Sequence, residues 1–125
     1  FLKKVPAGSE VSYGRTWRAE RDTKLASLPV GYGDGYFRAF GNRAEALVRG
    51  QRVPVVGRVC MDICMLDVTD VPHVSEGDRV ILLGSMGSET VTASELASLI
   101  DTIPYEVLCA VSPRVPRIYT GGRPE

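Results

Sequence analysis

The sequence predicts a mainly β domain, built as a barrel-like or strongly bent antiparallel sheet with one or two short helices. Short segments rich in Val, Ile, Leu, Thr and Tyr alternate with turns of Gly, Pro, Asp or Asn, which is typical of antiparallel sheets. The clearest helical pattern comes late in the chain, after Thr92. The 125 residues suit one domain with a core of its own, and closing the sheet would protect its edge strands.

Strands are expected through most of the chain. Gly50 lies between two of them and marks a tight hairpin, because glycine adopts a positive φ without steric cost. Phe1–Pro6 resembles the middle of a strand leading into a turn, so we expect the chain to be part of a longer protein. The other strands are predicted at Glu10–Trp17, Lys24–Val30, Ala44–Arg49, Gln51–Val59, Ile63–Val68 and Arg79–Leu83, and a last one at Val115–Tyr119 would close the sheet.

The segments between the strands are predicted as a loop and two helices. Tyr32–Phe40 is too rich in glycine for a stable helix and should form a loop with one irregular turn. Thr92 followed by Glu95 is a capping box, and the apolar residues after it repeat at helical spacing. A helix should therefore begin there and stop before Pro104. A second short helix should start at Pro104, where a missing amide costs nothing, and run through Cys109.

The composition argues against several classes of protein. Fifteen basic and fifteen acidic residues leave no net charge that would draw the chain to nucleic acid or anionic lipid. No apolar run approaches the roughly 20 residues that span a bilayer. We therefore expect a cytoplasmic protein with neither nucleic acid nor membrane as a partner. Cys60, Cys64 and Cys109 are odd in number and lie in apolar stretches, which favours reduced, buried thiols over disulfides.

No local motif alone identifies a catalytic site. His73 is the one histidine and lies in a polar loop, where a surface position is commoner than a role as general base. Cys60 and Cys64 lack the second ligand pair of a zinc site, so we expect no metal. The glycines of Gly31–Gly35 match neither the dinucleotide fingerprint nor the P-loop, and a tight turn is the simpler interpretation.

Several segments carry a pattern when they are taken together and in order. They are Val11–Trp17, Leu28–Tyr36, Gly57–Asp62, and Pro104–Val107 with Arg114–Arg117. In these segments the chain resembles the alanine racemase C-terminal domain family. Any one segment is modest support, but all of them in register are specific, and the resemblance covers almost the whole chain.

The resemblance implies an amino-acid racemase that interconverts L- and D-alanine with pyridoxal phosphate, the D-alanine serving peptidoglycan synthesis. Members of the family are homodimers, in which the C-terminal domain of one subunit reaches over an N-terminal barrel of the other. The barrel carries the lysine that binds the cofactor, and it is absent from residues 1–125. We therefore expect this chain to be one β domain that is inactive alone and has no assignable cofactor ligand.

The resemblance also implies a catalytic residue, Tyr13. It matches the tyrosine that moves the α-proton on one face of alanine while the barrel lysine serves the other face, which is a two-base mechanism. A free tyrosine has a pKa near 10, so a phenol that acts as a base near neutral pH needs neighbouring positive charge or hydrogen bonds to its oxygen.

Five further residues receive roles from the same resemblance. Met61 matches the position whose backbone N–H binds the substrate carboxylate, and Cys60 and Asp62 on either side are expected to shape its loop. Tyr32 and Arg38 resemble residues that line a narrow access corridor to the active site.

One position departs from the family pattern. Pro113 stands where many members have a tyrosine that contacts the cofactor phosphate, and proline offers neither a hydroxyl nor an amide donor. Two other functions stay open. The racemase could accept serine or a broader set of amino acids, because the missing barrel shares the pocket. The chain could also be a non-catalytic β-barrel binding module, although its zero net charge argues against nucleic acid.

Overall fold

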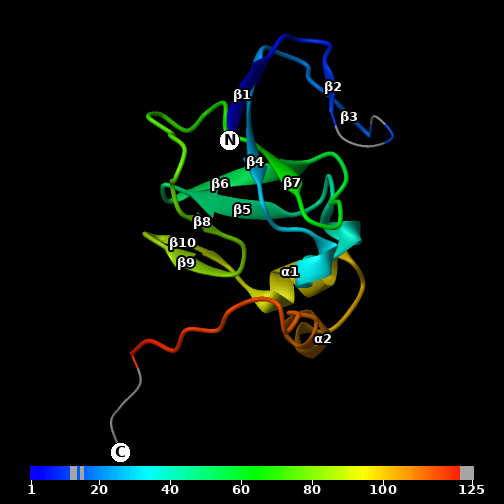
Figure 1. Cartoon of the computed structure of the whole chain (residues 1–125), viewed down its shortest axis with the longest axis vertical. Coiled ribbons are helices and arrows are strands. Elements are labelled where there is room, and N and C mark those ends of the chain that lie inside the picture. The colour runs from blue at the N-terminus through cyan, green and yellow to red at the C-terminus, as the bar shows by residue number, and fades with distance from the viewer. Residues whose placement is uncertain (12–13, 15, 122–125) are drawn as a thin grey trace, which may run out of the picture.

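A six-stranded antiparallel sheet, in the order β1-β4-β7-β6-β5-β8, is the main element of the structure. The structure is a computed structural model, and it describes residues 1–11, 14 and 16–121. In Figure 1, β1 and β4 run lengthwise whereas β5 and β6 run across the view, so the sheet is strongly bent but not closed into a barrel. Its strands are β1 Leu2–Val5, β4 Thr23–Leu28, β5 Glu45–Val48, β6 Gln51–Val56, β7 Cys64–Asp67 and β8 Val80–Ile81.

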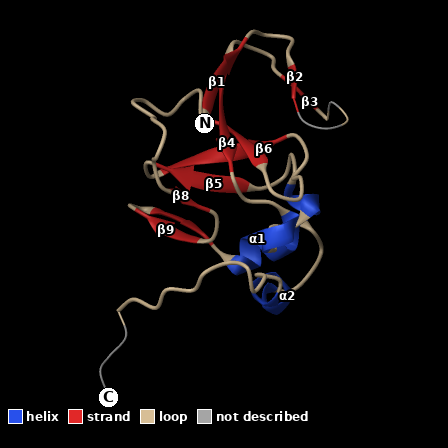
Figure 2. Cartoon of the chain, viewed as in Figure 1, coloured by secondary structure: helices blue, strands red, loops and turns tan. Residues whose placement is uncertain are grey.

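Smaller elements flank this sheet on two sides. Figure 2 shows the helices gathered at one end of the strands, and Figure 1 shows the β2–β3 pair beyond the other end. The flanking strands are β2 Glu10–Val11, β3 Trp17–Arg18, β9 Gly84–Met86 and β10 Glu89–Val91. The helical elements are the 3₁₀ turns η1 Tyr32–Asp34 and η2 Arg38–Phe40 and the α-helices α1 Ala93–Leu99 and α2 Pro104–Cys109.

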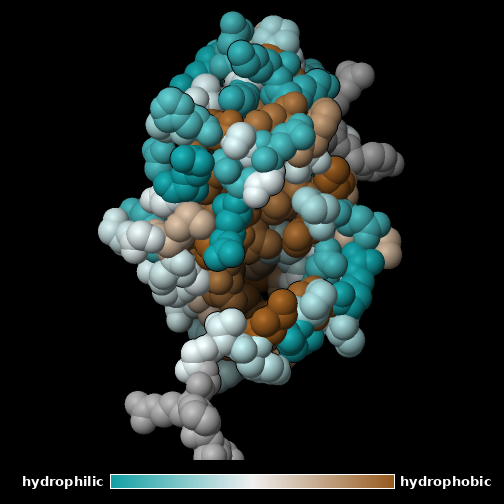
Figure 3. Space-filling model, turned by 60° about the vertical axis from the view of Figure 1, so that its left-hand side comes forward, coloured by the Kyte–Doolittle hydropathy of each residue, from teal (hydrophilic) through white to brown (hydrophobic). Residues whose placement is uncertain are grey.

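The bent sheet has a hydrophobic core on each side. The larger core packs β5, β6 and β7 against η2, α1 and α2, with Phe40, Leu66 and Leu96 almost fully buried. The smaller core packs Val11, at the end of β2, and Ala19, just after β3, against the sheet. Apolar side chains also reach the surface. Figure 3 shows a face that is hollowed in the middle, where hydrophobic residues line the hollow and hydrophilic residues surround it.

Local sequence patterns predicted the positions of several elements correctly. Arg49 and Gly50, both at positive φ, form the two-residue turn between β5 and β6. The Thr92 side chain accepts a hydrogen bond from the Glu95 amide and begins α1, and Pro104 opens α2. The other half of the expected capping box is not formed, because the Glu95 carboxylate binds Arg52 instead.

Other expectations were wrong. The segment Glu10–Trp17 is not one strand, because Glu10 pairs with Arg18 and Val11 with Trp17, so the chain reverses between them. Tyr32–Phe40 contains two 3₁₀ turns rather than one irregular turn. The strand expected to end at Val59 ends at Val56, and the next residue, Gly57, has a φ of 76°. The β9–β10 hairpin was missed.

The C-terminal segment also differs from its prediction. Val115–Tyr119 forms no strand, and Ile118 and Tyr119 are exposed. Pro116 interrupts this stretch, and the Arg117 side chain donates to carbonyl groups of the same segment of the chain, at Val111, Ser112 and Val115.

The cysteines are free, but not all are buried. Cys64 is buried, Cys60 is half-buried and Cys109 is exposed on α2, so the expectation of three buried thiols was wrong for Cys109. Within the described part of the chain, no helix is long and apolar enough to cross a membrane, and no group of three or more His, Cys, Asp or Glu is placed to hold a metal ion.

Arg52 joins the sheet to the helical layer. From β6 it binds the Glu95 carboxylate of α1 through two nitrogens, at 2.7 and 2.8 Å, and the Glu89 carboxylate of β10 at 3.0 Å. It also contacts Glu45 on the neighbouring strand at 3.3 Å. Hydrogen bonding to Arg52, and then its charge, hold the pKa of Glu95 below its ordinary value of 4.5.

The change Arg52→Met should lower the thermal midpoint of the domain at neutral pH. Because the folded-state pKa of Glu95 is depressed, the stabilisation that Arg52 gives is present above about pH 4.5 and is lost as the pH falls through the folded value. The difference between the native chain and the variant should therefore shrink below pH 4.5. Thermal unfolding followed by circular dichroism between pH 3 and 8 measures it.

Arg21→Met is the matched control, because Arg21 forms one ion pair with Asp70 on the open surface. A single exposed pair contributes little to stability. Equal effects of the two substitutions at every pH would show that Arg52 does not act as a link between the layers.

Candidate functional site

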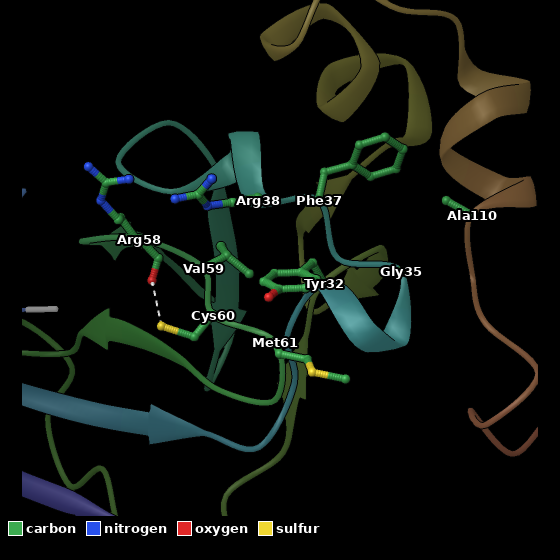
Figure 4. A pocket seen from close by; sticks show the side chains of 9 residues that line it. All are labelled: Tyr32, Gly35, Phe37, Arg38, Arg58, Val59, Cys60, Met61 and Ala110. Carbon is green, nitrogen blue, oxygen red and sulfur yellow. Dashed lines mark hydrogen bonds between the residues drawn. The ribbon is translucent and has the colours of Figure 1, made fainter. Parts of the chain in front are cut away.

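An open concave site of about 840 Å³ lies between η1, η2, the loop after β6 and the end of α2. It brings together four of the residues singled out from the sequence: Tyr32, Arg38, Cys60 and Met61 (Figure 4). Asp62 is the next residue of the same loop. Tyr13 lies outside the described residues. The lining residues are Tyr32, Gly35, Phe37, Arg38, Arg58, Val59, Cys60, Met61 and Ala110.

Two loops build the floor of this site by direct contact of their backbones. The Tyr32 amide donates to the Cys60 carbonyl at 2.9 Å, and the Gly33 amide donates to the Met61 carbonyl at 2.8 Å. A Cβ on Gly31 would lie 2.1 Å from the Cys60 oxygen. The glycine at position 31 is therefore needed for close approach, and Gly31–Gly35 is a docking turn, which agrees with the simple interpretation of its glycines as a turn.

This contact fixes the direction of the Met61 N–H. The Cys60 carbonyl and the Met61 N–H belong to one planar trans peptide unit, in which the two groups point in opposite directions. Because the carbonyl is bonded to the Tyr32 amide, the Met61 N–H points away from η1. It is the donor in none of the hydrogen bonds within the described part of the chain, and it can therefore donate to a ligand.

Positive charge stands on one side of the site. Figure 4 shows the guanidinium groups of Arg38 and Arg58 on the same side of Tyr32, with Ala110 across from them on α2. Tyr32 is 48% exposed, so its phenol reaches solvent in the site. A Cβ on Gly14 would lie 3.1 Å from Nε of Arg58, so Arg58 lies against the residue that follows Tyr13.

Arg114 is a residue of the site region to which the sequence assigned no role. Its Nε donates to Asp34 at 2.8 Å, and its Nη2 donates to Asp62 at 2.6 Å. The Asp34 carboxylate also accepts the Gly31 amide at 3.0 Å. This hydrogen bond from Gly31, followed by the one from Arg114, lowers the pKa of Asp34. Only the position of Arg114 in the segment Arg114–Arg117 could have drawn attention to it.

The chemistry of these groups suits an anion. The Met61 N–H, a phenol and guanidinium groups are donors that bind carboxylates and phosphates, whereas Phe37, Val59 and Ala110 give the site apolar walls. No lysine is among the lining residues in the described part of the chain. These groups can therefore bind and orient an anionic molecule.

Fold and site together define a bent-sheet β domain with an open, cation-lined face made by its loops. The profile of the family described as "Alanine racemase, C-terminal domain" matches residues 1–119. The chain therefore belongs to this family, and the resemblance seen in its sequence segments is confirmed.

Similar proteins agree with this assignment. The chain is 50% identical over 119 residues to an alanine racemase of Halothermothrix orenii, covering 95% of the chain and 31% of the relative, and 52% identical over 118 residues to that of Thermodesulfovibrio yellowstonii, covering 94% and 32%. The chain thus spans about a third of the length of these relatives.

Solved structures show the same fold. The alanine racemase from E. faecalis matches with a TM-score of 0.90 at 38% identity, over 96% of this chain and 32% of that one. The alanine racemase from Bacillus anthracis with bound L-Ala-P matches with a TM-score of 0.88 at 39% identity, over 98% and 31%. The one from Bartonella henselae, with covalently bound pyridoxal phosphate, matches with a TM-score of 0.83 at 26% identity, over 94% and 32%.

Proposed function

We propose that this chain is the C-terminal domain of a pyridoxal phosphate-dependent alanine racemase, which interconverts L- and D-alanine in the cytoplasm. The observation that carries the proposal is the family match over residues 1–119. The rest of the enzyme would come from the part of the protein outside this chain, with a barrel of the opposite subunit in a homodimer. Exposed apolar side chains at α2, those of Ile103, Tyr105 and Leu108, support a domain that another part of the protein covers.

In this proposal Met61 binds the substrate carboxylate through its backbone N–H. The direction of that N–H, away from η1, supports the role, since only main-chain geometry is needed. Cys60 contributes the carbonyl that fixes the peptide unit, and Asp62 holds the loop through Arg114. Tyr32 and Arg38 line the access corridor, where a phenol and a guanidinium favour small, anionic molecules.

The donors of the site fit the anionic parts of the cofactor and its substrate. Arg38 and Arg58 would supply positive charge, and the covalent attachment would be made by the lysine of the barrel outside this chain. When bound, pyridoxal phosphate supplies an electron sink that acidifies the α-proton of the amino acid. This chain would bind the carboxylate, restrict access and supply one proton-transfer group.

Tyr13 is that proton-transfer group. Its role follows from its match to the family tyrosine, and the position of Arg58 against Gly14 supports it. A phenol that acts as a base near neutral pH needs positive charge nearby, and in this proposal the Arg58 guanidinium would supply that charge. Tyr13 would serve one face of alanine and the barrel lysine the other, which inverts the centre.

The full-length protein tests the proposal directly. It should convert L-alanine to D-alanine and the reverse, with an absorbance band of bound pyridoxal phosphate, whereas the chain of residues 1–125 should show neither. Alanine, serine and lysine compared as substrates separate an alanine racemase from one of broader specificity. A full-length protein that binds the cofactor but racemises none of the three would contradict the proposal.

Met61→Pro in the full-length protein should raise the KM for alanine by about tenfold or more, because proline has no N–H to donate to the carboxylate. Met61→Leu is the control, since it keeps the backbone donor and a similar side-chain volume, and its KM should stay close to the native value. Steady-state kinetics with both variants decide the point. If Met61→Leu raises the KM as much as Met61→Pro does, the side chain of Met61 rather than its N–H binds the substrate.

A further inference from the structure

We propose that Arg114 is a positioning residue, which locks the Met61 loop, residues 60–62, onto η1 and thereby sets the affinity for the substrate carboxylate. The inference deepens the proposed function and rests on it. Arg114 carries no role in the resemblance to the family, and it does not line the open site. Arg114 would therefore affect binding indirectly, by fixing the positions of the two loops that it contacts.

The contacts of Arg114 join three segments that are far apart in the sequence. Asp34 lies 80 residues before it, and Asp62 lies 52 residues before it. One guanidinium binds both carboxylates, at 2.8 and 2.6 Å, and its Nη2 also approaches the Met61 carbonyl at 3.4 Å. The two carboxylates belong to the two loops whose backbones meet at the floor of the site.

Two backbone hydrogen bonds lie next to these ion pairs, one within the η1 turn and one between the two loops. Asp34 accepts the Gly31 amide, which closes the η1 turn, and the Gly33 amide holds the Met61 carbonyl. A Cβ on Gly33 would lie 2.4 Å from Nη2 of Arg114, so the guanidinium packs directly on the turn. Moving Arg114 would therefore loosen the Met61 carbonyl and, through the adjacent peptide unit, the direction of the Met61 N–H.

The expected effect falls on binding rather than on chemistry or overall stability. The Arg114 side chain is 43% exposed, and ion pairs at such positions contribute little to global stability. A small displacement of a group that binds substrate, in contrast, can cost a large factor in affinity. The proton-transfer group, Tyr13, belongs to a different segment, so kcat should change little.

The test uses the full-length protein with Arg114→Met, Arg114→Lys and the control Arg117→Met. Arg117 lies in the same segment but, among the residues that the structure describes, donates only to carbonyls of that segment. Arg114→Met should raise the KM for alanine about tenfold, with kcat within about threefold of native. Arg114→Lys keeps the charge, but its single ammonium group cannot bind both carboxylates as the forked guanidinium does. The KM of Arg114→Lys should therefore lie between those of native protein and Arg114→Met. Arg117→Met should behave as native.

Hydrogen exchange measured by mass spectrometry supplies a second readout that needs no activity. Peptides covering residues 31–35 and 58–63 should exchange faster in Arg114→Met than in native protein, and Arg117→Met should leave them unchanged. An unchanged KM with unchanged exchange in Arg114→Met would overturn the inference, and so would equal effects in Arg117→Met. If Arg114→Met does not fold, Arg114→Lys and Asp62→Asn carry the same comparison.

The two proposals fail in different ways. If the native full-length protein does not racemise alanine, the proposed function fails, whereas the exchange rates still show whether Arg114 holds the Met61 loop. If the native protein is active but the kinetics and exchange of Arg114→Met match it, only the role of Arg114 is wrong.

Discussion

Replacing Tyr13 by phenylalanine in the full-length protein should lower the racemisation of alanine by roughly 10²–10⁴-fold, the usual worth of a positioned acid–base group. The change removes one oxygen atom and keeps the aromatic ring. Folding and the absorbance of the bound cofactor should therefore persist. Steady-state rates measured in both directions, with circular dichroism as a check on folding, give the size of the loss.

Exchange of the α-proton in deuterated buffer shows which face Tyr13 serves. In Tyr13→Phe, exchange into D-alanine should continue through the barrel lysine, whereas exchange into L-alanine should nearly stop. Wild-type exchange rates for both enantiomers, or an equal and small slowing of both, would show that Tyr13 is a packing residue and that another group is the base.

Gly31→Ala should destabilise the domain by about 1–3 kcal/mol and raise the KM for alanine in the full-length protein, because the new methyl group overpacks the floor of the site. Its Cβ would lie 2.1 Å from the Cys60 oxygen and 2.5 Å from the carbonyl carbon and oxygen of Met61. These are backbone atoms, so the two loops must separate. The φ of Gly31, −153°, suits any residue, and the cost is therefore purely steric.

Gly77→Ala is the comparison for this prediction. A Cβ on Gly77 would meet nothing within 4 Å, but the φ of +90° would strain an alanine, at about 1–2 kcal/mol. Urea unfolding of both variants gives the free energies, and only Gly31→Ala should change the KM. A native KM for Gly31→Ala would show that the Met61 loop does not depend on its contact with η1.

The sequence predicted those elements whose signal is local. The Arg49–Gly50 turn, the Thr92 cap and Pro104 at the start of α2 each depend on the conformational preference of one or two residues. Strand ends were harder to predict, because they depend on which segment pairs with which. Val115–Tyr119 has the composition of a strand, but no strand of the described chain pairs with it.

The candidate site was predicted in part, and from the family resemblance rather than from residue spacing. Tyr32, Arg38, Cys60 and Met61 do line one site. Arg114 could not be predicted, because its partners come from loops more than 50 residues away, and such contacts exist only once the sheet has brought the loops together.

The open sheet leaves β1 as an edge strand, and the composition of that strand bears on solubility. β1 pairs with β4 on one side and has no strand on its other side in the described chain. Two of its four residues, Lys3 and Lys4, are exposed. Adding a foreign strand there would crowd or desolvate two ammonium groups, which opposes edge-to-edge aggregation. The domain should therefore tolerate high concentration without forming intermolecular sheets, and replacing both lysines by valine should remove that protection.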